Sequence, residues 1–460
     1  MPNDLTISLT PEVLDTGSPE ERATFGLLAL TANDRLLTQG IDTDSEVLRQ
    51  GPYVPGYPLA EWLVWNWWRI RWEFGRPSDG IAASRWNFAH QMPTVGNSYV
   101  WPNITVSSDG VSAFVQSRPS SSPEAVLFRF LGTNHREEVS ALALEEAIES
   151  FANDVLSRLE VDGLRETNLH RLWDDLLTER ADPELARYRK LEALLGYDPD
   201  EADEGAVRHR LDDAAALGEE AMGELAADAT TLYDNPLKCM AWSKDLSDIA
   251  ERRGFDANLR TGFSLADTAS TSKPGAVQAW RLGEQLARNV RRQAALDGER
   301  ISNGLLAEFA GTTAAAISET EQHSSSISFA LNRCDERARV SLRSKWVTGR
   351  RFDLARLLGD RLAYTQISKL SEGLSPATRS FSYRQKMQRA FAAELLSPIV
   401  AVDEMLKGDY SEEKQTEVAT YFKVSPMIVQ SQLVNHGRIR LADAPDIFSR
   451  GAAFQEAGAT

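Results

Sequence analysis

Arg356 and Asp360 are oppositely charged residues four positions apart, in a segment whose apolar spacing predicts a helix over 352–362. Residues four apart lie on one face of a helix, so these two side chains are expected to be neighbours. There they can form an ion pair, worth about 0.3–0.5 kcal/mol on an exposed helix. Leu357 follows Arg356 directly and has no group that can take a proton. The three residues therefore favour charge pairing over catalysis.

The longer segment GRRFDLARLLGD, at 349–360, resembles the active-site helix of the ImmA/IrrE family. These are bacterial and phage zinc metallopeptidases whose helix is usually written RFxLAHELGH. The resemblance continues at 389–398, RAFAAELLSP, where the family has a phrase like ANxFAAxLLMP, and then from Val418 to Gly437. It covers roughly 230–440, under half of the chain. The resemblance implies a zincin-like fold for this part.

In that family an HExxH helix binds one zinc ion through two histidines, and the intervening glutamate activates the metal-bound water. In this sequence the first histidine position is Arg356, the glutamate position is Leu357 and the second histidine position is Asp360. The family's further acidic ligand is expected within 384–390, which contains neither Asp nor Glu. The resemblance therefore implies a degenerate active-site helix or ligand cleft, with no catalytic residue, no metal ligand and no cofactor.

Other residue types that bind metals are scattered along the chain. No two of the six histidines fall within the short spacings of a metal pair; they are His90, His135, His170, His209, His323 and His436. A site assembled in space from His323 or His436 with Asp360 stays open, and it would make the protein an active metal-dependent peptidase with a relocated site. Cys239 and Cys334 are single and form no CxxC pattern, which fits small buried residues in a reducing cytoplasm.

The end of the resembling region has the rhythm of a helix-turn-helix, with helices expected over 412–422 and 426–436 around Lys423-Val424-Ser425. As a DNA reader, its second helix would present Gln430, Gln432 or Asn435 to base edges. We favour a structural role instead, because the second helix has no arginine before Arg438. The alternative reading is a DNA-binding transcriptional regulator.

An aromatic cluster characterises the N-terminal part. Spacings of three, three and four predict that four tryptophans share one helical face: Trp62, Trp65, Trp68 and Trp72. We favour a core stripe packed against a sheet. The alternative is an exposed aromatic surface that binds a base, a peptide or a protein.

The elements around these residues predict an α+β fold that is predominantly helical. Hairpins are expected across Asn33-Asp34 and across Asp109-Gly110, because these residues readily supply the positive φ angles of tight turns. Helices are expected over 142–164, 172–195 and 280–292, and short strands over 324–330 and 338–342. We divide the chain into four regions: a Trp-rich α+β domain at 1–160, a helical acidic connector at 161–229, the ImmA/IrrE-like pseudopeptidase domain at 230–445 (with the helix-turn-helix-like pair at 411–437) and a tail at 446–460.

The 460 residues carry 67 acidic and 50 basic side chains, a net charge of −17. Such an acidic chain is not a general binder of nucleic acids or anionic membranes. No apolar run reaches the roughly 18 residues that span a bilayer, and we expect a cytoplasmic protein without membrane partners. The resemblance implies a bacterial binding, sensor or regulatory component in stress response or phage defence. Its expected partner is a protein or peptide, with DNA as the alternative.

Overall fold

The structure is a computed structural model. It describes residues 4–75, 77, 80–120, 127–132, 136–233, 235–259, 262–263, 277–318, 325–332, 337–364 and 373–439. His135, His323, Cys334 and the expected tail at 446–460 lie outside these residues.

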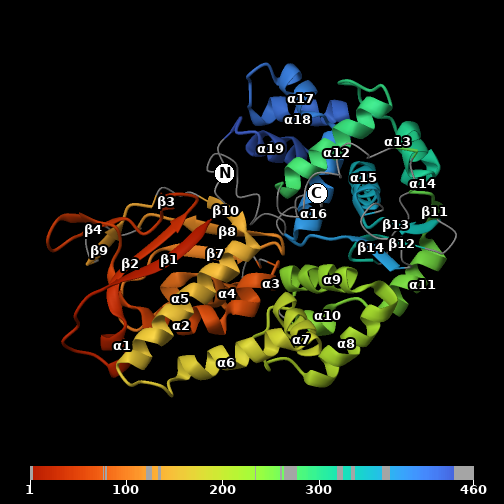
Figure 1. Ribbon diagram of the computed structural model, residues 1–460. Coiled ribbons are helices and arrows are strands. Elements are labelled where there is room, and N and C mark those ends of the chain that lie inside the picture. Colours follow the sequence, from red (N-terminus) through yellow and green to blue (C-terminus); the bar gives the residue numbers. More distant parts are fainter. Residues whose placement is uncertain are drawn as a thin grey trace. The chain divides into compact units, whose positions relative to one another are not determined.

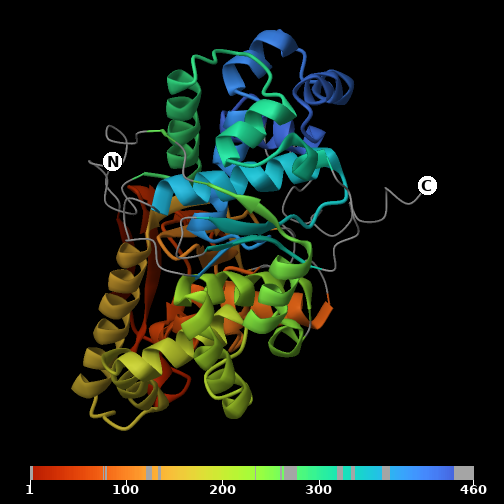
Figure 2. The same ribbon diagram turned by 90° about the vertical axis from the view of Figure 1, so that its right-hand side faces the viewer.

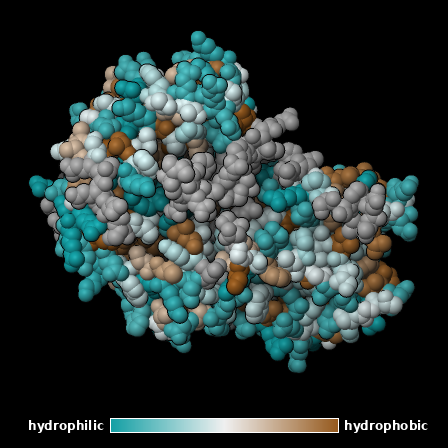
Figure 3. Space-filling view, turned by 180° about the vertical axis from the view of Figure 1, so that it is seen from behind, coloured by the Kyte–Doolittle hydropathy of each residue, from teal (hydrophilic) through white to brown (hydrophobic). Residues whose placement is uncertain are grey.

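The chain is α+β and largely helical, and its internal contacts divide it into two compact units. Unit 1 comprises Met1–Arg208 with Leu232–Leu237, and unit 2 comprises His209–Thr231 with Lys238–Thr460 (Figure 1). The region expected as a connector is thus shared between the two units. Within the described ranges, none of the helices combines the length and apolar character that crossing a bilayer requires. Hydrophilic residues cover much of the face in Figure 3, with smaller hydrophobic groups between them.

The elements of unit 1 are β1 (Leu5–Pro11), α1 (Pro19–Ala23), β2 (Phe25–Ala32), β3 (Arg35–Leu36), β4 (Gly40–Asp42), β5 (Val47–Arg49), β6 (Tyr53–Pro55), α2 (Gly56–Trp65), α3 (Trp67–Trp72), α4 (Gly80–His90), the 3-10 helix η1 (Met92–Val95), β7 (Ile104–Ser108), β8 (Ser112–Ser117), β9 (Phe128–Phe130), β10 (Arg136–Ser140), α5 (Ala141–Val161), α6 (Asn168–Ala181) and α7 (Pro183–Leu194). Helix α8 (Glu204–Leu217) begins in unit 1 and ends in unit 2.

Both predicted hairpins of unit 1 are present. Asn33 and Asp34 have φ angles of 50° and 65° between β2 and β3, and Gly110 has a φ of 95° between β7 and β8. Strand β1 buries every second residue, which places Leu5, Ile7 and Leu9 in the core. Helix α5 begins at the side-chain cap of Ser140 and buries one face of its 21 residues in the same core. Two antiparallel sheets and this helix therefore enclose the apolar centre of unit 1.

The elements of unit 2 are α9 (Glu219–Leu232), α11 (Ser243–Arg253), β11 (Phe255–Ala257), α12 (Ala279–Gln293), α13 (Asn303–Ala310), α14 (Ala314–Ser318), β12 (Ser328–Asn332), β13 (Ala338–Ser341), α15 (Val347–Tyr364), β14 (Gly373–Ala377), α16 (Tyr383–Leu396), α17 (Ile399–Leu406), α18 (Glu412–Phe422) and α19 (Pro426–Asn435). The short helix α10 (Pro236–Cys239) crosses the division between the units.

Unit 2 contains one antiparallel sheet, with its strands in the order β11-β13-β12-β14. Helix α15 runs along this sheet and contacts β14 and β12 (Figure 2). Helix α16 packs between α15 and α12 at glycines: a Cβ at Gly359 would lie 2.5 Å from the ring of Phe391, and one at Gly283 would lie 2.3 Å from the carbonyl of Met387. Gly359 thus brings α15 close to one side of α16, and Gly283 brings α12 close to the same helix.

Candidate functional site

Helix α15 turns Arg356 and Asp360 into the interior of unit 2 rather than toward solvent. Their residues are 6% and 1% exposed, and Leu357 between them is fully buried. We therefore consider a buried polar site formed by α15, α16, β14 and α9, all within unit 2.

The predicted ion pair between Arg356 and Asp360 does not form, because each side chain has its own partners. Arg356 donates through Nη2 to the carbonyl of Thr378 at 2.5 Å and to Oε1 of Gln385 at 2.6 Å. The nearest carboxylate to its guanidinium is that of Asp353, at 3.6 Å. The contacts that Thr378 and Gln385 offer to Arg356 are short and shielded from water. They are therefore more favourable than a pairing with Asp360 along the helix.

Asp360 is bound instead by two residues of α16. Its Oδ1 accepts from Nε of Arg384 at 2.7 Å and from Nε2 of Gln388 at 2.8 Å, and its Oδ2 accepts from Nη2 of Arg384 at 2.6 Å. The two parallel bonds from Arg384 are the bidentate geometry that a guanidinium and a carboxylate prefer. Gln388 also donates to the carbonyl of Pro376 on β14. Asp360 therefore joins α15 to α16 and, through Gln388, to the sheet.

Two buried polar atoms of this site have no hydrogen-bond partner among the described residues. They are Nε of Arg356, a donor, and Oε1 of Gln388, an acceptor. A buried polar atom without a partner costs about 1–3 kcal/mol, but both atoms are shielded from solvent, so a bound group could reach them only if a neighbouring segment moved.

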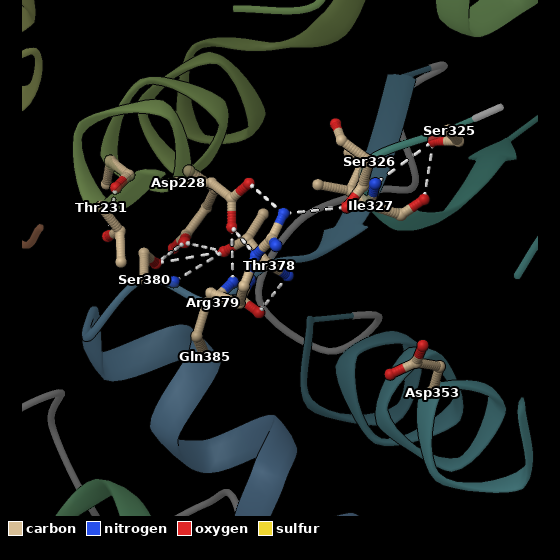
Figure 4. Close-up of polar contacts among 12 residues, drawn as sticks. Asp228, Thr231, Ser325, Ser326, Ile327, Asp353, Thr378, Arg379, Ser380 and Gln385 are labelled. Carbon is tan, nitrogen blue, oxygen red and sulfur yellow. Dashed lines mark hydrogen bonds and ion pairs between the residues drawn. The ribbon is translucent and has the colours of Figure 1, made fainter. Parts of the chain in front are cut away.

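Helix α9 closes the site on the side of β14 and the start of α16. Glu224 accepts hydrogen bonds from Ser380 and Ser382, and Asp228 accepts from the backbone N–H and guanidinium of Arg379. Figure 4 shows Asp228 and Arg379 pointing toward each other, with Arg379 also reaching the carbonyl of Ser326. Sequence reasoning missed this helix, since no local pattern links it to residues about 150 positions away.

Burial dominates the electrostatics of the site. It raises the pKa of the Glu224 carboxyl, against the hydrogen bonds from Ser382 and Ser380 and the charge of Arg384. Burial also lowers the pKa of the Arg356 guanidinium. Desolvation and the charge of Arg356 lower the pKa of Arg389 to about 9. Charged forms are therefore costly here unless they are paired.

The donor set of the site does not suit a metal ion. Asp360 has both oxygens engaged by Arg384, a cation that a zinc ion would repel. His436, weighed as a partner for Asp360, bonds Glu284 through Nε2 at 2.7 Å and stands edge-on to Trp280. Among the described residues there is no group of three or more His, Cys, Asp or Glu side chains that could hold a metal.

The four tryptophans that were expected on one helical face do not share it, which corrects the sequence interpretation. The helix is interrupted at Asn66, whose Nδ2 donates to the carbonyl of Trp62 and so separates α2 from α3. Trp62 and Trp68 are buried, and their indole N–H groups bond Phe88 O and Glu179 Oε2. Trp65 is 48% exposed. Trp72 is half-buried, with Arg71 and Lys190 over its ring.

The helix-turn-helix-like pair consists of α18 and α19, with Lys423 in the left-handed conformation between them. Gln432 is buried and exchanges hydrogen bonds with Ser397, through its amide nitrogen to the carbonyl and its oxygen from the hydroxyl. Gln430 is half-buried and Asn435 is exposed. Arg438 pairs with Asp403. Of the expected DNA contacts, Gln432 is thus committed to the interior of unit 2.

Unit 1 contains a second buried polar cluster that the sequence did not reveal. His90 is fully buried, with Nδ1 2.8 Å from the carbonyl of Val106 and Nε2 3.0 Å from Glu73. Glu73 also accepts from Nε of Arg69 at 2.9 Å, and Arg69 reaches Asp198. Both nitrogens of His90 have partners and Glu73 is paired with Arg69, whose Nη2 is the one atom of these three side chains recorded without a hydrogen bond, so we interpret the cluster as structural. Only the i,i+4 spacing of Arg69 and Glu73 was a local signal.

Comparison of the chain with family models, with curated proteins and with solved structures found no significant match.

Proposed function

We propose that unit 2 is a degenerate metallopeptidase-like domain of ImmA/IrrE type, which acts as a binding, sensor or regulatory component. The observation that carries the proposal is the contact of Asp360 with Arg384 and Gln388. In the resemblance, Asp360 occupies a histidine position and 384–390 is the window of the missing acidic ligand. Residues that would share a metal in an active relative are thus in direct contact here.

The contact of Arg356 with Gln385 supports the same alignment. Arg356 occupies the other histidine position, and Gln385 lies in the same window of α16. Two positions of α15 therefore meet one stretch of α16, as a zinc site shared by the two helices would require. In the proposed alignment, polar side chains that hydrogen-bond one another occupy the positions of the metal ligands.

The orphaned atoms support a binding role. Nε of Arg356 is a donor and Oε1 of Gln388 is an acceptor, and both lack partners. A peptide group presents one acceptor and one donor, so a peptide segment has the complementary chemistry. We therefore propose a protein or peptide as the partner, in a bacterial regulatory or phage-defence setting that rests on the resemblance.

The alignment is tested by rebuilding the motif. The test variant carries Arg356→His, Leu357→Glu, Asp360→His and Gln388→Glu, with Arg384→Ala to remove the competing cation. If α15 and α16 have the proposed correspondence, elemental analysis should find about one zinc per chain, because two imidazoles and one carboxylate make a three-ligand zinc site. The matched control carries Asp360→Ala with the other four changes; it should bind far less zinc, because it keeps only two of the three ligands.

The alignment would be contradicted by a variant that keeps the wild-type circular dichroism spectrum but binds no more zinc than its control. Arg356→Ala and Gln388→Ala then test binding separately: each should weaken a partner captured from the native host by about tenfold, since each removes one polar contact.

A DNA-binding regulator is the alternative, favoured by the observed pairing of α18 and α19 across a three-residue turn. Salt-dependent binding of duplex DNA that Asn435→Ala weakens would support it. Absence of binding at low salt, by a folded protein, would contradict it.

A further inference from the structure

The carboxylate of Glu224, on α9, is buried against the start of α16. Oε1 of Glu224 accepts from the hydroxyl of Ser382 at 2.6 Å, and Oε2 accepts from the hydroxyl of Ser380 at 2.7 Å. A longer contact of 3.5 Å reaches the hydroxyl of Thr378. Glu224 is 6% exposed, and none of the described residues bonds it through a cationic group. Its hydroxyl cradle accommodates a neutral carboxyl as well as a carboxylate, because a hydroxyl both donates and accepts.

The contact of Glu224 with these hydroxyls is structurally important because of where they lie. Ser382 is the N-cap of α16, where its oxygen accepts from the backbone N–H of Gln385. Glu224 therefore reaches the first turn of the helix that binds Arg356 and Asp360. Asp228, one turn further along α9, holds the adjacent Arg379.

The charged groups around Glu224 come from three helices. Asp228 lies on α9 itself, Asp360 and Arg356 lie on α15, and Arg384 and Arg389 lie on α16. Asp360 and Asp228 are each bonded to an arginine, Arg384 and Arg379 respectively. Within the described part of the chain the partners of Glu224 are hydroxyls, so it is the carboxyl of this group whose ionisation lacks a bonded counter-charge there.

We propose that Glu224 is a proton-controlled latch: α9 is docked most firmly on the start of α16 when this carboxyl is protonated, and it loosens when the carboxyl ionises. The released surface would be the segment 378–385, which binds Arg356. This inference is independent of the metallopeptidase-like alignment, which could fail while the latch operates.

The sign of the effect follows from burial. Burial raises the pKa of Glu224 above the ordinary value of 4.5, and the charge of Asp360 adds to the rise. Folding with a raised carboxyl pKa gains stability that is fully present below 4.5 and is lost as the pH rises through the folded-state pKa. Docking should therefore weaken from acidic toward alkaline pH.

Hydrogen–deuterium exchange with mass spectrometry tests the latch on the full chain. Protection is measured over 221–231 and 379–385 between pH 5 and 8.5, below the pKa of Arg389, with times scaled for intrinsic exchange rates. We expect wild-type protection to fall at least fivefold across this range. Glu224→Gln should remove the dependence, because an amide does not ionise. Glu251→Gln, at an exposed glutamate of α11, should behave like the wild type.

Two outcomes would overturn the proposal: equal wild-type protection at all pH values, or a dependence that survives Glu224→Gln. A second variant guards against misfolding of the first. Ser380→Ala removes a hydrogen bond that lowers the pKa of Glu224, so it should move the loosening midpoint to higher pH. An unchanged midpoint in Ser380→Ala would also overturn it.

Discussion

Arg384 on α16 donates two parallel hydrogen bonds, of 2.7 and 2.6 Å, to Asp360 on α15. The side chain of Asp360 is 1% exposed and that of Arg384 is 11% exposed. A buried carboxylate in this setting requires a counter-charge, and the one it has comes from the same chain. In the proposed alignment, this cation fills the region where an active relative holds its metal.

Breaking this pair should be costly. Asp360→Ala removes the bidentate carboxylate partner of Arg384 in a largely desolvated site, so we expect a loss of about 3 kcal/mol in the free energy of unfolding of unit 2. The double variant with Arg384→Met should lose less than the sum of the single changes. Urea denaturation followed by hydrogen exchange of α15 measures this. Arg208→Ala, which breaks the exposed pair with Glu204, is the control and should cost under about 0.5 kcal/mol.

The contact of α15 with α16 should tolerate no added methyl group at Gly359. A Cβ there would lie 2.5 Å from the ring of Phe391, so Gly359→Ala should destabilise unit 2 by about 1–3 kcal/mol despite the better helix propensity of alanine. Gly205→Ala on α8 is the matched control, because its Cβ would meet only Asp203 at 3.5 Å. Thermal denaturation followed by circular dichroism compares the two. Equal effects would contradict the packing described.

The buried cluster of unit 1 should give an acid-sensitive stability. Burial alone would raise the pKa of Glu73, but the charge of Arg69 and the hydrogen bond from His90 lower it below the ordinary 4.5. A lowered carboxyl pKa gives stability that is present above 4.5 and is lost as the pH falls through the folded-state value. Glu73→Gln should cost about 3 kcal/mol at pH 7 and less at pH 3.

Tryptophan fluorescence can follow that experiment, because most tryptophans of the chain lie in unit 1. The cluster would have to be reconsidered if the cost of Glu73→Gln were the same at both pH values.

Alanine substitutions of Trp65 and Trp68 should differ in their effect on stability, because one ring is exposed and the other is buried. Trp68→Ala removes a ring that is 5% exposed and a bond to Glu179, so it should cost about 3–5 kcal/mol. Trp65→Ala should change stability by under about 1 kcal/mol, because that ring is 48% exposed. Denaturation curves measure both. Comparable losses would place Trp65 in the core.

Much of the local structure was predictable from the sequence. The positive φ angles at Asn33, Asp34 and Gly110 follow from turn chemistry, and the apolar spacing of α12 and of α18 with α19 located those helices. The helix expected over 172–195 is instead two helices, α6 and α7, because Asp182 caps a new start at Pro183. Helix α15 begins at Val347, earlier than its apolar pattern indicated.

The partners of the site residues were not predictable, because they are distant in sequence. The i,i+4 rule pairs Arg356 with Asp360, but it describes exposed helices and not one covered by α16 and β14. Arg384 lies 24 positions from Asp360, and Glu224 lies 158 positions from Ser382. Only the folded chain brings such groups together, and burial then decides their ionisation.

The most direct test of the central claim is elemental analysis of the purified wild-type chain, combined with a peptidase assay before and after chelation. The account predicts well under 0.1 equivalents of zinc per chain, on the order of a trace contaminant, with no chelator-sensitive cleavage of protein substrates. About one tightly bound zinc per chain, with peptidase activity that disappears on chelation and returns with zinc, would contradict it.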